Sequence, residues 1–107
     1  MDWNKIDIKG ISRIDKCVAE FDVWAIPTVP YAKFKVKVFQ DLNGKYTGYT
    51  NLRVKSDFDG SPEGGIGYGN SIDEALENTL QYFMELVKQK GEELGEEDIE
   101  YSESSDF

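Results

Sequence analysis

The sequence predicts an α+β domain, in which an antiparallel sheet of three to four strands is followed by one long amphipathic C-terminal helix packed on one face of the sheet. Apolar and charged residues alternate along residues 31–40, and apolar residues recur at every third or fourth position along residues 72–87. The first spacing is typical of a strand with one buried face, and the second is typical of a helix with one buried face. A chain of 107 residues has the length of one domain.

The strand-like segments come first along the chain. We expect a loosely alternating strand over residues 6–14 with a break at Gly10, and a second strand over residues 17–26 that ends before two prolines. Residues 31–40 form the clearest strand, because three lysines alternate with apolar side chains. A further strand is expected over residues 45–55, so that the last two strands form a hairpin.

The register of this hairpin follows from its turn. A two-residue loop would place apolar side chains opposite charged ones. A three-residue loop that ends at Gly44 pairs Val36 with Thr50, and two residues further on it pairs Phe34 with Leu52. It also puts Gly44 at the left-handed position of a type I turn with a G1 bulge, where glycine is favoured. We therefore prefer the three-residue loop.

The helix is the next element, and a glycine-rich segment, residues 56–70, leads into it as a predicted long loop. Ser71 and Glu74 are spaced as a capping box, which predicts the first turn of the helix there. Gly91 is placed to end the helix after roughly 19 residues. The stripe expected to face the sheet consists of Ile72, Leu76, Leu80, Phe83 and Val87.

The acidity of the chain is concentrated at one end. The formal net charge is −9, but residues 1–91 hold 13 acidic and 12 basic side chains, a net of −1, whereas residues 92–107 hold 8 acidic and no basic ones. We therefore expect a single α+β domain over residues 1–91 and an acidic, disordered tail over residues 92–107. Within the tail, Ile99 and Tyr101 suit a short edge strand.

Several kinds of chemistry are excluded by the residue types present. The chain has no histidine and one cysteine, which excludes Ser-His-Asp triads, Cys-His dyads and an intramolecular disulfide and argues against a zinc site. The glycine run of residues 64–69 lacks the lysine of a phosphate-binding loop and indicates a connector. We expect no enzymatic activity, no cofactor and no metal. No apolar run approaches the ~20 residues of a membrane helix, and no secretion signal is visible, so we expect a cytoplasmic protein without membrane contact.

The candidate binding residues lie on the outer side of the predicted hairpin. In the preferred register Lys33 is opposite Arg53, and cations and aromatic residues share one face without an acid among them. Because like charges on adjacent strands repel, this face favours an anionic neighbour. A nucleic acid, an acidic protein partner and the chain's own acidic tail are all open, as is a solvated face. The predicted partner-binding residues are Lys33, Lys35, Lys37, Tyr49, Arg53 and Lys55.

A resemblance to a known family is carried by the segment Gly69-Asn70-Ser71-Ile72-Asp73-Glu74-Ala75-Leu76-Glu77-Asn78-Thr79. This segment resembles the helix start of HicB-type antitoxins, in which a strand and a glycine-containing loop lead into a helix with a Thr/Ser-x-x-Glu-Ala-Leu-x-Asn pattern. The resemblance implies a sheet-plus-helix domain that occludes a small RNA-acting toxin.

These observations predict a small cytoplasmic protein-binding domain that neutralises or regulates a partner protein, as antitoxins, immunity proteins and other small acidic inhibitors do. The hypothesis depends on the small size, the absence of a catalytic constellation and the acidic end. One alternative is single-stranded nucleic-acid binding through the basic face of residues 31–55, with an affinity that falls steeply with salt. Another is a homodimer formed by pairing of sheet edges.

Overall fold

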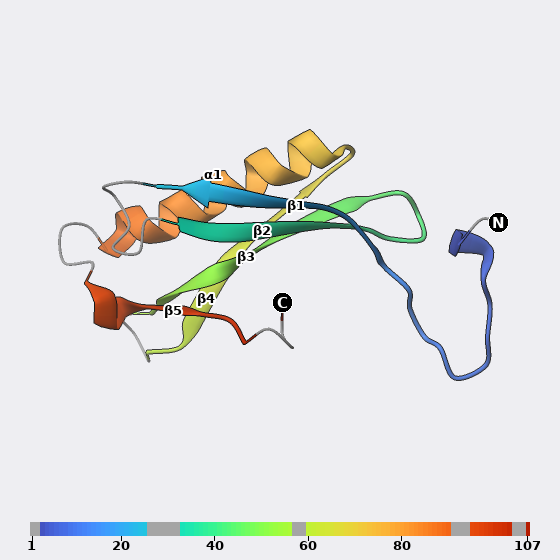
Figure 1. The fold of residues 1–107 in the computed structure, drawn as a ribbon, viewed down its shortest axis with the longest axis horizontal. Coiled ribbons are helices and arrows are strands. Elements are labelled where there is room, and N and C mark those ends of the chain that lie inside the picture. Colours follow the sequence, from blue (N-terminus) through green and yellow to red (C-terminus); the bar gives the residue numbers. More distant parts are fainter. Residues whose placement is uncertain (1–2, 26–32, 57–59, 91–94, 104–106) are drawn as a thin grey trace.

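An antiparallel sheet of five strands is covered on one face by one long helix, as Figure 1 shows. This arrangement confirms the predicted α+β fold. The computed structural model describes residues 3–25, 33–56, 60–90, 95–103 and 107. Their elements, in chain order, are η1 (Trp3–Lys5), β1 (Lys16–Trp24), β2 (Lys33–Gln40), β3 (Tyr46–Lys55), β4 (Pro62–Gly69), α1 (Ile72–Lys90), η3 (Glu96–Asp98) and β5 (Ile99–Tyr101).

The first four strands form a meander in which each strand is antiparallel to the next. The β2–β3 hairpin has the predicted register, with Val36 opposite Thr50 and Lys37 opposite Tyr49. A slip of one residue would turn every apolar side chain of β2 away from the helix. The hydrophobic pattern and the turn therefore select the same register.

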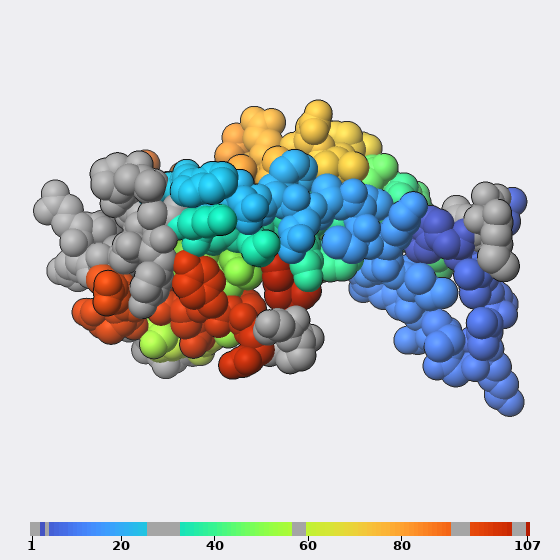
Figure 2. All heavy atoms as spheres, viewed as in Figure 1, coloured from blue at the N-terminus to red at the C-terminus, as the bar shows by residue number. Residues whose placement is uncertain are grey.

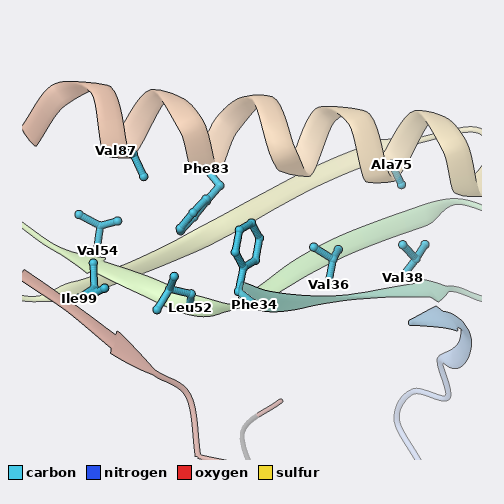
Figure 3. Close-up of a cluster of buried hydrophobic side chains, with 9 residues drawn as sticks. All are labelled: Phe34, Val36, Val38, Leu52, Val54, Ala75, Phe83, Val87 and Ile99. Atoms are coloured by element: carbon cyan, nitrogen blue, oxygen red, sulfur yellow. The ribbon is translucent and has the colours of Figure 1, made fainter. Parts of the chain in front are cut away.

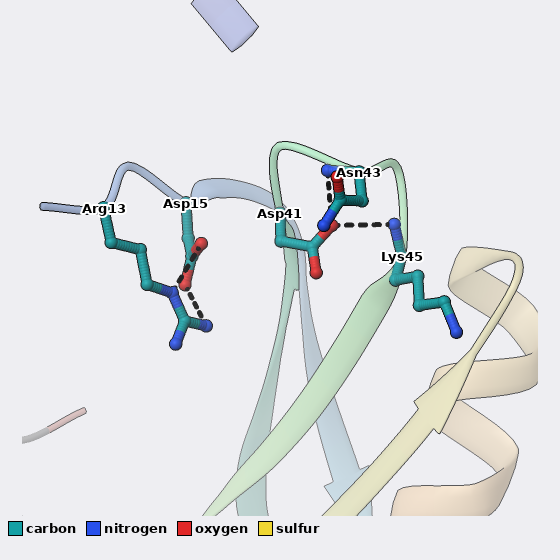
Figure 4. Close-up of polar contacts among 5 residues, drawn as sticks. All are labelled: Arg13, Asp15, Asp41, Asn43 and Lys45. Carbon is teal, nitrogen blue, oxygen red and sulfur yellow. Dashed lines mark hydrogen bonds and ion pairs between the residues drawn. The ribbon is translucent and has the colours of Figure 1, made fainter. Parts of the chain in front are cut away.

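The turn of this hairpin also follows the prediction. Gly44 has a φ of 81°, the left-handed conformation that glycine adopts without steric cost. Asp41 closes the turn, because its carboxylate accepts the backbone N–H groups of Asn43 at 2.9 Å and Lys45 at 3.0 Å (Figure 4). Its own N–H donates to the carbonyl of Lys45 at 2.9 Å.

Beyond Thr50, β2 separates from β3, and the tail takes its place. The predicted pairing of Lys33 with Arg53 is wrong, because β5 pairs with this part of β3 instead. Since β4 occupies the other edge of β3 at Arg53, β5 lies on the side that β2 leaves. The sheet thus branches, with β2 beside one half of β3 and β5 beside the other half.

Side-chain hydrogen bonds join the branches. Asn51 Oδ1 accepts the backbone N–H of Lys35 at 2.8 Å, where a ladder bond would otherwise continue. The Tyr101 hydroxyl donates to the carbonyl of Lys33 at 2.7 Å and so ties β5 back to β2. For the same reason the predicted pair of Phe34 and Leu52 is not a ladder pair, although both side chains are buried in the core.

The loop predicted over residues 56–70 is wrong for residues 62–69, which form the strand β4. Residues 62–69 extend the sheet, and their glycines face the helix at alternate positions. A Cβ at Gly67 would stand 2.2 Å from the backbone nitrogen of Thr79, and one at Gly69 would stand 2.6 Å from that of Ala75. These glycines have no positive φ, so their function is to let the helix approach the strand rather than to turn the chain.

The core lies between α1 and the sheet, as Figure 3 shows. Phe34 and Phe83 meet at its centre with ring centroids 4.8 Å apart. Ser71 caps the helix as predicted, since its hydroxyl accepts the N–H of Glu74 at 3.1 Å. The most buried line of the helix is Ala75, Thr79, Phe83 and Val87, while the predicted Ile72, Leu76 and Leu80 flank it. The two small residues of this line, Ala75 and Thr79, lie directly over Gly69 and Gly67.

Within the acidic segment of residues 92–107, the disorder predicted from composition does not hold for residues 95–103. Residues 96–98 form η3, and Ile99 and Tyr101 belong to β5, the short strand for which they are suited. Ile99 is only 4% exposed and lies in the core beside Val54. An ion pair of 3.6 Å between Lys90 and Asp98 connects this segment to the end of the helix. Backbone pairing and apolar burial outweigh the local excess of acids.

The N-terminal arm, residues 3–14, projects from the sheet (Figure 1). The strand predicted over residues 6–14 is wrong: the backbone hydrogen bonds here are local, from Ile6 N–H to Trp3 and from Ile11 N–H to Ile8. No described strand lies beside the arm, and a strand without a partner has no ladder. The molecule therefore measures 49 × 27 × 20 Å, and its radius of gyration of 15.5 Å exceeds the about 13 Å of a compact domain.

No helix in the described part of the chain combines the length and the apolar character that crossing a bilayer requires.

We predict that Gly67→Ala lowers the free energy of unfolding by about 3 kcal/mol, because the added methyl group overlaps the helix backbone. Gly64→Ala on the same strand is the control. Its Cβ would meet the flexible Arg53 side chain at 3.3 Å, so we expect a change below about 1 kcal/mol. Urea unfolding of the two variants measures the difference. Equal losses would show that the helix does not depend on the glycine face.

We also predict that Ile99→Ala destabilises the protein by about 2–4 kcal/mol, as truncation of a core residue does. The exposed Glu103→Ala is the matched control within the same acidic segment, with an expected change under about 0.5 kcal/mol. Thermal and urea unfolding provide the values. If Ile99→Ala behaved like Glu103→Ala, β5 would be dispensable for the fold.

Candidate functional site: the outer face of the sheet

The face of the sheet opposite α1, called here the outer face, has no helix over it in the described residues. Its side chains alternate with the buried ones along each strand, as the exposed and buried positions of β2 illustrate. Figure 2 shows β1, β2 and the C-terminal segment side by side on the visible surface. The predicted binding residues can therefore be judged by what surrounds them there.

The three lysines of β2 form the predicted row, but each faces a group from another strand. Lys35 pairs with Asp22 of β1 at 3.5 Å, and Lys37 is opposite Glu20 in the ladder. Lys33 Nζ lies 5.1 Å from the centre of the Trp24 ring.

Lys37 also meets the C-terminal segment. Its Nζ donates to the backbone carbonyl of Phe107 at 3.1 Å and lies 4.5 Å from the centre of the Phe107 ring. Hydrogen bonding and a cation–π contact thus join the lysine row to the far end of the sequence.

The remaining predicted residues lie on β3. Arg53 Nη2 is 3.5 Å from Glu100 Oε1, and its Nε is buried without a hydrogen-bond partner. Tyr49 contacts Phe39 edge-on, with ring centroids 5.9 Å apart. Lys55 lies at the end of β3 opposite Pro62. Since β5 separates β2 from this half of β3, Arg53 and Lys55 do not continue the lysine row.

The hairpin itself contributes no acid to this face, and the acids come from neighbouring strands. The prediction considered one hairpin, whereas Glu20 and Asp22 come from β1 and Glu100 comes from β5. Of the neighbours left open by the sequence, the chain's own acidic segment is present beside Arg53. Much of the basic character of the row is consequently balanced within the molecule.

The outer face contains a hollow of about 540 Å³. Phe39, Tyr49 and Ile66 line it with apolar surface from three neighbouring strands. Phe107 and Ser102 border it from the C-terminal segment. Its other lining residues are Asp15, Thr50, Arg53, Glu63, Gly64 and Gly65. The hollow can take an apolar side chain, and the acids at its border suit a cation next to that side chain.

Tyr49 and Arg53 of this hollow are among the predicted binding residues, whereas Ile66 and Asp15 are not. Ile66 lies in the segment predicted as a loop, and Asp15 has no predicted function. One signal was available: Ile66 and Tyr68 alternate with glycines, which is the period-two pattern of a strand with glycine on one face. Asp15 lines the hollow because the arm leaves the sheet at this residue, and no pattern in the neighbouring sequence predicts that position.

Glu63 at the border of the hollow is fixed by a contact to the helix. Its carboxylate accepts a hydrogen bond from the Tyr82 hydroxyl. This hydrogen bond, with smaller contributions from desolvation and from the charge of Glu63, raises the pKa of Tyr82 above its ordinary value. The bond therefore links the outer border of β4 to the exposed side of α1.

The comparisons with known proteins give no match: no family model fits the chain, and no curated protein or solved structure is significantly similar to it.

We predict that the phenol of Tyr82 ionises at a higher pH in the wild type than in a Glu63→Gln variant. Because the pKa of Tyr82 is raised in the folded state, the contribution of this bond to stability is complete below the ordinary tyrosine pKa of about 10 and is lost as the pH rises through the folded-state value. Tyrosinate absorbance of the wild type, Glu63→Gln and Tyr82→Phe identifies the phenol. Identical curves for the wild type and Glu63→Gln would exclude the coupling.

Proposed function

We propose that the chain is a protein-binding domain that neutralises or regulates a partner protein, and that the outer face is its contact surface. The observation that carries the proposal is the hollow, where an apolar and aromatic surface lies open on the side of the sheet that α1 leaves uncovered. Protein interfaces are built around such anchor pockets, lined by aromatic residues and arginine. Phe39, Tyr49, Phe107 and Arg53 are the residues of the hollow with this character.

The charges around the hollow indicate the chemistry of the partner. Among the described residues that line it, Asp15, Glu63 and Arg53 are charged: Asp15 pairs with Arg13, Glu63 accepts a hydrogen bond from Tyr82, and Arg53 pairs with Glu100. The chain as a whole carries a net charge of −9. A basic partner that presents an apolar side chain flanked by cations fits this surface, and long-range attraction would accelerate its association. The helix start resembles that of HicB-type antitoxins, and the resemblance implies a domain that occludes a small RNA-acting toxin.

Single-stranded nucleic-acid binding receives no support from the arrangement of the lysines. Lys35 faces Asp22, and Lys37 is occupied by Phe107. Phosphate contacts would have to displace these groups, and the acids would repel the backbone of a nucleic acid. A protein partner therefore remains the function that the surface supports best.

The test uses substitutions rather than removal of residues 92–107, because that deletion would take Ile99 out of the core. We predict that Ile66→Lys weakens partner binding by at least about 30-fold, the effect of losing an interface anchor worth about 2 kcal/mol. Gln81→Lys places the same charge on the exposed side of α1 and serves as the matched control. We expect the tagged wild type and Gln81→Lys to retain one stoichiometric protein from the host lysate, and Ile66→Lys to lose it.

Thermal unfolding of the three proteins checks that each is folded. Retention of the same partner by Ile66→Lys would exclude the hollow as the contact. Recovery of nucleic acid without a stoichiometric protein would contradict the proposed function itself.

A further inference from the structure

The N-terminal arm exposes apolar side chains that nothing in the described part of the chain covers. It carries four isoleucines, Ile6, Ile8, Ile11 and Ile14. Ile8 is 58% exposed and Ile11 is 54% exposed, although both belong to the residue type most often found in protein cores. The arm also lacks a ladder partner, despite having the alternation of a strand around Ile6 and Ile8.

The arm has the chemistry that the hollow requires. Residues 3–14 contain three basic side chains, Lys5, Lys9 and Arg13, and one acidic side chain, Asp7, whereas the whole chain has a net charge of −9. The arm is thus a basic, isoleucine-rich segment on an acidic protein. The hollow offers apolar surface from Phe39, Tyr49 and Ile66 with acids at its border. The two surfaces therefore match in hydropathy, and the basic arm is opposite in sign to the net charge of the chain.

The geometry favours contact between two copies over contact within one. The arm leaves the sheet at Asp15, which borders the hollow of its own chain, and then runs away from it (Figure 1). Asp15 is held by Arg13 through an ion pair of 2.6 Å and a hydrogen bond of 3.0 Å, as Figure 4 shows. Extended, the twelve residues of the arm reach roughly 40 Å, enough to cross the 27 Å width of a neighbouring copy.

We infer that the N-terminal arm of one copy docks in the hollow of a second copy, with Ile8 and Ile11 as its anchors. Exchange of both arms gives a closed two-fold dimer with two identical contacts. The inference rests on the proposed function in that it uses the same hollow, and it adds a regulatory step. A partner protein must displace the arm before it can occupy the hollow.

Pairing of β1 edges, the other route to a homodimer, is disfavoured by the charges. An antiparallel β1 pair with its two-fold axis at Phe21 would set Glu20 of each copy opposite Asp22 of the other on the same face. The irregularity between Cys17 and Ala19 also bends this edge, a common protection against edge pairing.

The test is the mass of the purified full-length protein by sedimentation equilibrium over a range of concentrations. We expect a dimer of twice 12.2 kDa for the wild type and for Gln81→Lys. The arm variant, Ile8→Lys with Ile11→Lys, and the hollow variant, Ile66→Lys, should each dimerise at least about 100-fold more weakly, since both contacts are lost. The arm variant lies outside the core, so its folding is not at risk.

A mixture of the two variants distinguishes arm exchange from general association. The arm variant keeps an intact hollow and the hollow variant keeps an intact arm, so the mixture should form a heterodimer with one contact, weaker than the wild type but stronger than either variant alone. A monomeric wild type, a dimer insensitive to the arm variant, or a mixture that stays monomeric would each overturn the inference.

The outcomes also separate this inference from the proposed function. A monomeric protein that loses its lysate partner on Ile66→Lys would remove the exchanged arm and leave the function in place. A dimer that behaves as predicted but retains no partner from the lysate would support the exchanged arm and contradict the proposed function.

Discussion

The close contact between α1 and the glycines of β4 is the constraint on which the rest of the structure depends. With hydrogen in place of a side chain at Gly65, Gly67 and Gly69, the helix lies almost against the strand backbone. This contact restricts the helix residues above it to Ala75 and Thr79. The Thr79 hydroxyl donates to the carbonyl of Ala75 at 2.6 Å, so its burial leaves no unsatisfied hydroxyl group. Larger side chains flank this line and fill the core toward β2.

The same contact has a consequence on the other face of the sheet. Because alternate residues of β4 are glycines that face the helix, Ile66 and Tyr68 must face outward. Ile66 thereby joins Tyr49 and Phe39 in an apolar surface that the single helix cannot cover. In the described residues one long helix covers one face of the five-stranded sheet, and the hollow lies on the other face.

The branch point of the sheet decides the electrostatics of this face. Where β2 leaves β3, the free edge of β3 pairs with β5, which brings Glu100 to Arg53 and Ile99 into the core. An acidic segment that would repel itself in isolation is held by backbone pairing and by apolar burial. The outer face therefore combines apolar anchors with acids, the opposite of the basic surface that a hairpin by itself suggests. Both the proposed basic partner and the proposed arm exchange follow from this combination.

The sequence by itself determined the elements whose signals are local. The α1 start at Ser71, the β2–β3 register and the left-handed Gly44 follow from capping, alternation and turn chemistry within a few residues of each. Only the tertiary structure decided the approach of α1 to the glycines of β4, the place of β5 and the acids beside the lysines. Glycines in a strand make sense only once a helix lies against them, and an edge of β3 is free for β5 only where β2 departs. Both depend on contacts between segments distant in sequence, and so does the hollow, whose lining residues range from Asp15 to Phe107.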